Sequence, residues 1–568
     1  MMQKKKKKQI KQRTTLPQLR QMPANFRKPF LGSFLPSVWP GFLNSSLYNS
    51  SLKVRRMPDR IMGFPSESIN GAAEYGHALI FGEMICGGYV RPFRSMRELK
   101  KIDLAPQPWL DGVHDFTWLR DLQAVNTAQA GRIARQYVDE WFNHYRTYDK
   151  QSWQPHILAR RIINIFSSWS FIHDHADAPF RLRIRFDLCT QATHLERRIH
   201  TVKRPEDRIT CICGILWSGL HLQDWQNRIP PATSMLLYEL DRQILDDGGH
   251  ISRSPQVSLN ILSDLVDLAH NLAYNRMQVP IELEAAIVRL SSFIRSMRHE
   301  DGGLALFNDS LENNRIYIDT LLARSRTNNN ADFIFPDSGY VSLKADKTTA
   351  IMDLAKKASP LSEEHIYASP LAFELSSHGQ RIVVNAGAEY DINLPGSATR
   401  RTTLKSTRAH STLSVGQGDA VMRNIKSGNP NLRMDGDRQA ITASHNGWEK
   451  QGWFHQRSLW LSFDGNELMG QDILKPVKAN VTGKEPVILR FHLHPNIRAE
   501  HIDGYSGVVI YLPDGERWYF DIAEGNLSLG RGTWMGRAND IRDIQSIVIP
   551  VPVYHNQVSI DWRFYRLG

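Results

Sequence analysis

The chain has 568 residues, of which 41% are hydrophobic and 23% are charged. These values predict a folded protein with two to four domains, and they exclude a largely disordered chain. The formal net charge is +12, but residues 1–58 hold 13 Lys and Arg and no Asp or Glu, while the other 510 residues hold 57 basic and 58 acidic side chains. The charge excess therefore belongs to one end of the chain, and the body lacks the positive charge typical of a nucleic-acid-binding protein.

Residues 1–55 are expected to form a basic, disordered arm, because they begin with a run of lysines and lack a periodic apolar face. We expect no specific nucleic-acid partner, and only a weak contact between this arm and an anionic membrane surface. Residues 30–46 loosely resemble a secretory signal, although Pro29, Pro36 and Pro40 interrupt or adjoin them. An export signal and a stretch upstream of the true start both remain open. No run of 18 apolar residues occurs, so no membrane-spanning helix is expected.

Residues 56–105 contain short β-like pieces with glycines between them, such as HALIFGEMICGGYV. They are expected to pack as an N-terminal extension on the domain that follows.

Residues 106–310 place apolar side chains at helical spacing, which predicts a domain of helical hairpins. At least seven stretches show this pattern: WLRDLQAVN, ARQYVDEWFNHY, ILARRIINIFSSWSFI, RITCICGILWSGLHL, SMLLYELDRQIL, SLNILSDLVDLAHNLAYN and IELEAAIVRLSSFIRSM. Cys211 and Cys213 lie in one of them. They are interpreted as packing residues, because two thiols one residue apart without a partner cluster make a poor zinc site.

Two loops in this region resemble each other. ILDDGGHISRSP spans residues 244–255 and MRHEDGGLALFND spans residues 297–309. Each follows a predicted helix and carries Asp-Gly-Gly, and Asp247 and Asp301 lie about one helical hairpin apart. Stacked hairpins with glycine-terminated helices are therefore expected.

From about residue 331 the period changes from 3.6 to 2. GYVSLKADKTTAIMDL, RSLWLSFDG, VILRFHLH and SGVVIYLPDGERWYFDI all alternate apolar with polar residues. This pattern predicts a large antiparallel β-sandwich over residues 311–568. Helices followed by strands predict a multidomain α + β protein rather than a parallel sheet.

The order of the motifs is more specific than any one of them. The hairpins and the two Asp-Gly-Gly loops are followed by NAGAEYD at residues 385–391 and by TRAHSTLSVG at residues 407–416. In this order the chain resembles the heparinase II/III-like proteins, a polysaccharide lyase superfamily, and within it bacterial members of an alphaproteobacterial type. The resemblance covers about residues 56–568. It implies an incomplete α/α toroid followed by a β-sandwich, with the substrate cleft between them.

By this resemblance, a carbon–oxygen lyase that cleaves an acidic, uronate-containing polysaccharide is expected. β-Elimination needs a positive group at the sugar carboxylate, a base for the C5 proton and an acid for the leaving oxygen. The helical region offers interleaved aromatic and basic residues to bind the polymer: Trp118, Trp153, His156, Arg160 and Arg161. The alternative is that about half of the tryptophans of this region are core residues and that Arg120 pairs with a carboxylate.

The first Asp-Gly-Gly loop is expected to contribute His250 as acid or base and Arg253 as carboxylate clamp, because functional residues concentrate on loops held by a rigid framework. The alternative is that Asp247 and Arg253 pair to shape the loop.

His410 lies in a motif whose histidine, by the resemblance, faces the cleft and takes part in catalysis. In some family members it lies near a zinc site. No cofactor is required by the sequence, and zinc held by His410 and His455 is the candidate metal site. The alternative is a histidine at a sheet edge without a chemical role.

The chain departs from the family pattern at two places. Active members carry Ser-Pro-x-Tyr-His in the first loop, where this chain has Val257 and Ser258, and an Asn or His in a preceding helix, where this chain has KRPEDRIT at residues 203–210. A first alternative is therefore a non-catalytic glycan-binding or envelope-assembly protein. A second is a toroid hydrolase that uses two carboxylates, drawn from Asp246, Asp247, Glu300 and Asp301. Family likeness favours the cell envelope or periplasm, while the lack of a clean signal peptide leaves the cytoplasm open.

Overall fold

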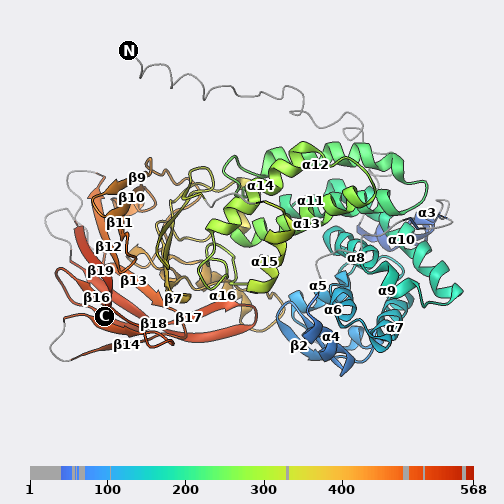
Figure 1. The fold of residues 1–568 in the computed structure, drawn as a ribbon, viewed down its shortest axis with the longest axis horizontal. Helices are drawn as coiled ribbons and strands as arrows, with labels where there is room; N and C mark the ends of the chain where they lie inside the picture. The colour runs from blue at the N-terminus through green and yellow to red at the C-terminus, as the bar shows by residue number, and fades with distance from the viewer. Residues whose placement is uncertain are drawn as a thin grey trace, which may run out of the picture.

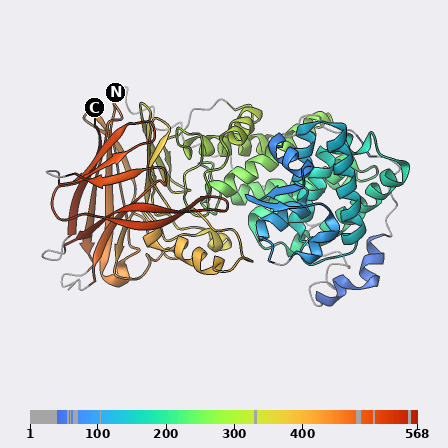
Figure 2. The same ribbon diagram turned by 90° about the horizontal axis from the view of Figure 1, so that it is seen from below.

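The computed structural model describes residues 40–53, 58, 61–62, 71–102, 104–327, 332–477, 485–502, 506–552 and 558–567. In these residues the chain forms a helical domain and a β domain, which lie end to end along the longest axis (Figure 1). The view from below shows the same division, with the segment around α16 beside the boundary (Figure 2). The predicted disorder of residues 1–39 falls outside the described residues.

The helical domain consists of antiparallel helices joined by short loops. Its helices are α3 Ser46–Leu52, α4 Ala73–Ile80, α5 Gln107–Asp115, α6 Trp118–Val125, α7 Ala128–Tyr145, α8 Pro155–Ser167, α9 Trp169–His173, α10 Ala178–Arg198, α11 Pro205–His221, α12 Ile229–Gln243, α13 Pro255–Tyr274, α14 Ile281–Ser296 and α15 Arg315–Arg324. Among the described residues, no helix is both long and apolar enough to cross a membrane.

Helix α11 is the centre of this domain. It packs against α8, α10, α12 and α13, and its side chains are buried along almost the whole helix. Gly214 allows the close approach to α8, because a Cβ there would lie 2.9 Å from the Cβ of Ala159. Cys211 and Cys213 are buried, unbonded thiols on this helix, as their packing interpretation predicted.

Part of the predicted disordered arm is folded. Helix α3 packs on α10, with Tyr48 and Leu52 buried. The Tyr48 hydroxyl lies 2.7 Å from Nδ1 of His194. The prediction for residues 1–55 is therefore wrong for residues 40–53, because the apolar side of this single short helix is covered by the helical core.

The segment expected as a β-like extension is mixed. HALI belongs to α4, and a hairpin of β1 Glu83–Cys86 and β2 Tyr89–Pro92 follows it. The segment packs on the helical domain as predicted, since α4 lies against α6. At the other boundary, α15 extends the helical domain beyond residue 310, because Ile318, Leu321 and Leu322 join the helical core.

The β domain contains two antiparallel sheets. Its strands are β3 Ile334–Phe335, β4 Tyr340–Ala345, β5 Thr348–Asp353, β6 Phe373–Ser377, β7 Gln380–Val384, β8 Leu413–Val415, β9 Asn431–Asp435, β10 Arg438–His445, β11 Trp453–Ser462, β12 Glu467–Pro476, β13 Val487–Leu493, β14 Arg498–His501, β15 Val508–Tyr511, β16 Arg517–Ile522, β17 Ser528–Arg537, β18 Asp540–Val551 and β19 Val558–Leu567. One sheet has the order β14-β15-β16-β19-β12-β11-β10-β9. The other has the order β17-β18-β13-β7-β6-β5-β4-β3, with β8 also paired to β13.

The two sheets form a sandwich, because their inner faces share one core. Phe373 and Phe491 from one sheet pack against Trp562 and Phe564 from the other. Helix α16 Ser397–Lys405 and the short helix η5 Pro360–His365 lie outside this core. The period of 2 along the strands was therefore a correct indication of a two-layered antiparallel domain.

The two Asp-Gly-Gly loops have the same internal structure. In each loop, the aspartate Oδ1 accepts a hydrogen bond from the backbone N–H of the second glycine, Gly249 or Gly303. The carbonyl of that glycine accepts the N–H of the residue two positions before the aspartate, Leu245 or His299. The first glycines, Gly248 and Gly302, have φ of +92° and +86°, a region that disfavours other residues. The predicted likeness of the two loops thus extends to their hydrogen bonds.

Both loops dock against the β domain. Oδ2 of Asp247 accepts the N–H groups of Asp337 and Ser338 at 2.8 and 2.7 Å. Asp301 accepts from Nε and Nη2 of Arg381 at 2.7 and 3.2 Å. The second glycines permit this closeness, since a Cβ on Gly249 would lie 2.4 Å from the Ser338 Cβ.

Replacing Tyr48 by Ala is expected to lower the free energy of unfolding by about 3 kcal/mol, because it removes a buried ring and its bond to His194. Tyr48→Phe should lose only about 1 kcal/mol. Leu47→Ala, on the exposed side of the same helix, is the control. Urea unfolding measures all three, and equal stability of Tyr48→Ala and wild type would contradict the packing of α3.

Replacing Arg381 by Met is expected to cost about 3–5 kcal/mol of unfolding free energy, because the carboxylates of Asp301, Glu312 and Glu374 around it lose their shared cation. The exposed Arg315→Met should change stability by less than about 0.5 kcal/mol. Chemical denaturation measures this difference, and two similar unfolding curves would show that the junction does not depend on Arg381.

Candidate functional site

The predicted acid/base His250 is enclosed in the first Asp-Gly-Gly loop. It is fully buried, with Nδ1 2.8 Å from the Ser252 Oγ and Nε2 3.0 Å from the Gln243 Oε1. Burial lowers the pKa of His250 to about 4, so the ring is neutral at pH 7. Both nitrogens are therefore used inside the protein, and no face of the ring is open to a glycan.

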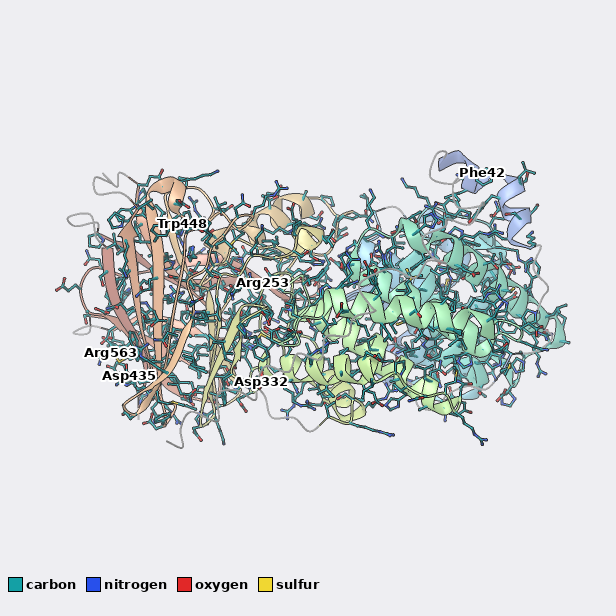
Figure 3. The ribbon with its side chains drawn as sticks, turned by 90° about the horizontal axis from the view of Figure 1, so that it is seen from above. Phe42, Arg253, Asp332, Asp435, Trp448 and Arg563 are labelled. Atoms are coloured by element: carbon teal, nitrogen blue, oxygen red, sulfur yellow. The ribbon has the colours of Figure 1, made fainter. Side chains whose placement is uncertain are left out.

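Arg253 joins the two domains instead of facing the cleft. Figure 3 labels it where the helical and β domains meet. It donates to the carbonyls of Ser338, Lys356 and Gly339 at 2.7, 2.6 and 3.2 Å, and its Nη2 lies 2.7 Å from the Asp353 Oδ1. The clamp prediction is corrected accordingly, because a buried guanidinium with these partners has no group left for a sugar carboxylate. It does not pair with Asp247, as the alternative expected, but with the β domain.

His410 is buried beside the β domain's second small core. Its ring lies edge-on to Tyr367 at 5.8 Å, and neither ring nitrogen has a hydrogen-bond partner among the described residues. The Leu404 backbone favours the protonated ring and so acts to raise the pKa of His410. Burial, helped by the nearby His492, lowers the pKa of His410 to about 3. Its cleft role stays a prediction, while the sheet-edge alternative does not fit a fully buried ring.

Three of the five predicted glycan-binding residues are interior. Trp118 and Trp153 are buried, and their Nε1 groups donate to backbone carbonyls at 3.1 and 2.9 Å. Arg161 is also buried, stacked 4.1 Å from the Trp141 ring and bonded to Gln191. Trp118 and Arg161 thus belong to the helical core. The alternative interpretation expected such a core position for about half of the tryptophans of this region.

The other two remain partly open. Arg160 pairs with Asp264 at 3.3 Å and keeps about a third of its side chain exposed. His156, at the start of α8, is a quarter exposed, and its Nδ1 lies 3.6 Å from the Asp207 Oδ2. The Arg120 alternative is confirmed, since Arg120 pairs with Asp267 at 3.3 Å.

The metal prediction at His410 and His455 finds no support in the geometry. The His455 Nε2 is bonded to Asp472 at 2.6 Å and its Nδ1 lies 3.1 Å from a nitrogen of His445. Arg457 already neutralises Asp472 in this buried cluster. Within the described residues, no three-ligand group contains either predicted histidine. The site does not fit zinc, because its carboxylate and imidazole are bonded to each other and to Arg457.

The carboxylates of the hydrolase alternative do not form a catalytic pair at the cleft. Asp247 and Asp301 bind the β domain, whereas Asp246 and Glu300 lie exposed beside them. The aspartates hold the loops, and this use explains why they recur.

A cavity of about 480 Å³ opens at the boundary between the domains. Its helical wall comes from α5, from the loop before α8, and from the segment between α10 and α11; Ile392 of the β domain completes it. Trp153 and Tyr148 line it with rings, and His156 lies at the edge. Among the predicted binding residues, only Trp153 and His156 reach this cavity.

The cavity carries more positive than negative side chains. Lys150, Arg198, Lys203 and Arg204 line it against the carboxylates of Asp111 and Asp207, which the same cavity contains. Lys150 and Lys203 are exposed and form no ion pair with the described residues, and Nη1 of Arg198 is buried without a hydrogen-bond partner among them. Partnerless cations in a hollow favour an anionic ligand.

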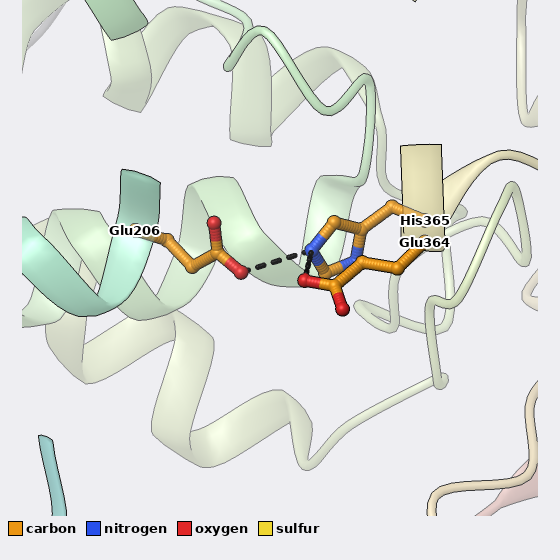
Figure 4. Close-up of side chains that lie close together, drawn as sticks. All are labelled: Glu206, Glu364 and His365. Carbon is orange, nitrogen blue, oxygen red and sulfur yellow. Dashed lines mark hydrogen bonds and ion pairs between the residues drawn. The ribbon is translucent and has the colours of Figure 1, made fainter. Parts of the chain in front are cut away.

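An ion cluster adjoins the cavity behind Arg204. The Nδ1 of His365, in η5, contacts Asp309. On the other side of the ring, its Nε2 lies 2.9 Å from the Oε1 of Glu206 in α11 (Figure 4). Glu364 is 3.7 Å from the same nitrogen. Burial alone would lower the pKa of His365, but Asp309 and Glu206 raise it to about 10. Burial would likewise raise the pKa of Glu206, but His365 lowers it to about 2.

This cluster is held together by ion pairs. Glu206, Glu364 and His365 also have the composition of a metal site, and their ligating atoms lie within 4.8 Å of one another. A metal ion bound there would have to displace the proton that Asp309 and Glu206 favour on His365. Arg204 adds a second cation, with its Nε 3.0 Å from Glu206.

Sequence reasoning missed four residues of this region: Glu206, Asp309, His365 and Tyr390. Glu206 lies in KRPEDRIT, a stretch noted above only because it lacks the family's Asn or His. The run of charged residues in this stretch was the sequence signal that could have pointed to Glu206. Tyr390 lies in the quoted motif NAGAEYD. Asp309 and His365 are 56 residues apart, and no sequence pattern joins them.

Comparisons with known proteins agree with this architecture. Residues 327–563 match the family described as Heparinase II/III-like, C-terminal. FtsZ-localized protein C of Caulobacter vibrioides is 28% identical over 430 residues, which cover 72% of this chain and 73% of that protein.

Solved structures show the same fold. A heparinase III structure has a TM-score of 0.71 at 13% identity and covers 91% of this chain and 88% of its own. A mutant of heparan sulfate lyase HepC from Pedobacter heparinus has a TM-score of 0.61 at 14% identity, with coverage of 92% and 88%. The predicted toroid followed by an antiparallel sandwich is confirmed.

The ion cluster predicts a specific pH dependence of stability. Because the pKa of His365 is raised from 6.5 to about 10, its contribution is complete below pH 6.5 and is lost as the pH rises through about 10. Wild type should therefore lose up to about 1.4 kcal/mol per pH unit across this window relative to His365→Gln. Urea unfolding at pH 6.5, 8 and 9.5 measures the difference. His144→Gln, an exposed histidine, should follow wild type, and parallel curves for His365→Gln would contradict the raised pKa.

Proposed function

We propose that this chain, whose residues 327–563 match the Heparinase II/III-like C-terminal family, binds an acidic, uronate-containing glycan in the cavity between its domains and cleaves it by β-elimination. A polymer of the cell envelope is the glycan class that family likeness favours. The proposal is supported by the fold and, above all, by the partnerless cations of the cavity.

The cations carry the proposal because of where they lie. Lys150, Arg198 and Lys203 surround a hollow whose volume is that of a ligand site, and Tyr148 offers a ring to the apolar face of a sugar. A neutral glycan would leave these charges without partners, whereas a uronate carboxylate forms charge-assisted hydrogen bonds with them. The cavity therefore favours an acidic polymer over a neutral one.

Arg204 has a different part in the same wall. It already pairs with Glu206, Glu364 and Asp207 at 3.0, 2.5 and 3.9 Å. These carboxylates satisfy its charge and hold it in place. We infer that substrate selectivity depends on Arg198 and Lys203, while Arg204 supports the wall.

A second candidate function is glycan binding without cleavage. Val257 and Ser258 occupy the positions where active family members carry Tyr and His, and both are buried in α13. Ser254 caps this helix and Pro255 begins it, so the Ser-Pro of the motif serves the helix start here. A relative named for localisation with FtsZ fits such a role, in which the protein would bind a glycan at the division site.

Replacing Arg198 and Lys203 together by Ala is expected to weaken binding of polygalacturonate or heparan sulfate by about tenfold or more, because two charge-assisted contacts of about 1.4 kcal/mol or more in sum are lost. Lys450→Ala, an exposed lysine of the β domain, is the matched control. Titration calorimetry at two salt concentrations measures affinity, and dextran should not bind.

The same polysaccharides distinguish the two candidates. Ultraviolet absorbance of an unsaturated uronate identifies the lyase. Binding that depends on Arg198 and Lys203 without any such product identifies the glycan-binding protein. Equal affinity of wild type and the double variant for every acidic glycan would contradict both.

A further inference from the structure

The cavity between the domains holds charges of both signs, and one carboxylate in it has no cation of its own. Asp111 of α5 lines the cavity together with Arg198 and Lys203, which lie at the end of α10 and in the segment after it. The side chain is partly buried, and its Oδ1 accepts a hydrogen bond from Nε2 of Gln107 at 2.6 Å. No described residue forms an ion pair with it. A partly buried carboxylate without a cation is unfavourable in the free protein, so a ligand that supplies the cation gains affinity.

The second carboxylate of the cavity is already paired. Asp207, in the first turn of α11, lies 3.6 Å from Nδ1 of His156 and 3.9 Å from Nη1 of Arg204. Asp111 is therefore the acidic side chain of this lining that a ligand can pair with. Burial raises the pKa of Asp111 to about 6, which leaves the carboxyl mostly ionised at pH 7.

We propose that the cavity selects a glycan in which a uronate neighbours a hexosamine with a free amine, and that Asp111 binds this ammonium group. This inference rests on the proposed function and names the sugar beside the uronate. The uronate carboxylate lies with Arg198 and Lys203, and the ammonium faces α5. A disaccharide carries the two groups on adjacent rings, and a cavity of about 480 Å³ is within the range of sites for ligands of that size.

The charge of Asp111 distinguishes three forms of the hexosamine. An ammonium group forms a charge-assisted hydrogen bond with the carboxylate, which is stronger than a bond between neutral groups. An N-acetyl group offers one neutral N–H donor. An N-sulfate places a second anion beside Asp111, and like charges in contact oppose binding. The expected order of affinity is therefore free amine, then N-acetyl, then N-sulfate.

A cavity that acted through its cations alone would give the opposite order. Lys150, Arg198 and Lys203 would bind the N-sulfated polymer most tightly, because it has the highest negative charge. They would bind the polymer with free amines most weakly, because its ammonium groups cancel part of that charge. A general attraction between charges thus cannot imitate the effect of Asp111, and the order of the three affinities reports whether this side chain takes part.

The test uses three forms of one polymer of matched length. Heparosan alternates glucuronate with N-acetylglucosamine, and it is compared with its N-deacetylated and N-sulfated derivatives by titration calorimetry at pH 7. Wild type is expected to bind the N-deacetylated form about tenfold or more tightly than the parent, and the N-sulfated form more weakly than the parent.

Two variants locate the effect. Asp111→Asn removes the charge but keeps an oxygen that can accept the Gln107 hydrogen bond, and it is expected to reverse the order, with the N-sulfated form bound most tightly. Asp241→Asn, an exposed aspartate of α12 outside the cavity lining, should keep the wild-type order. Thermal unfolding of both variants shows that they are folded, and the wild-type order decides the inference even without them.

Each outcome separates this inference from the proposed function. Wild-type affinities that are equal, or that follow negative charge, would overturn the inference and leave the proposed acidic-glycan site intact, provided that they still depend on Arg198 and Lys203. A preference for the free amine that Asp111→Asn retains would overturn the role of Asp111. Absence of binding to all three forms would overturn the proposed function, and this inference with it.

Discussion

The docking of two Asp-Gly-Gly loops against the β domain is the constraint on which the rest of the molecule depends. Each loop follows a helix, turns at a glycine with positive φ and directs an aspartate across the boundary. One aspartate accepts backbone N–H groups of Ser338, and the other binds Arg381. These bonds are partly buried and charge-assisted, so they are stronger than fully exposed ion pairs of the same geometry. They set the relative position of two domains that share no strand or helix.

The cavity is a consequence of that docking. Its cations come from the helical domain, and Ile392 of the β domain completes its lining. A second set of bonds supports this side. Asp391 accepts the backbone N–H of Gln107, and the His365 ring contacts both Asp309 and Glu206. Both sets of bonds hold the two domains together around this cavity.

Sequence periodicity predicted both layers, because apolar spacing directly reflects burial in helices and strands. The prediction from periodicity failed where the buried side chains are polar. Helix α10 was not among the predicted stretches, since its buried side carries Asp187, Gln191 and His194, and these bond to Arg146, Arg161 and Tyr48. The short helix α3 was assigned to a disordered arm for a different reason, because its two buried residues, Tyr48 and Leu52, are too few to form a visible repeat.

Site residues were harder to predict than the fold. His250, Arg253, Asp247 and Asp301 stand out in the sequence as polar residues on glycine-rich loops, and the structure uses Arg253 and both aspartates to join domains. The same composition serves a catalytic loop and a docking loop, because both need a polar side chain on backbone that only glycine can form. Residues such as His365 and Tyr390 meet their partners only through the fold, so no spacing along the chain reveals them.

His410 shows how the fold redistributes chemistry. Its ring is fully buried, neutral and without a hydrogen-bond partner among the described residues, at a position where the family resemblance expects a cleft histidine. Buried polar groups are rarely left unpaired, so this ring occupies its place at a cost in stability. The ring packs edge-on against Tyr367, and its role in the cleft stays a prediction.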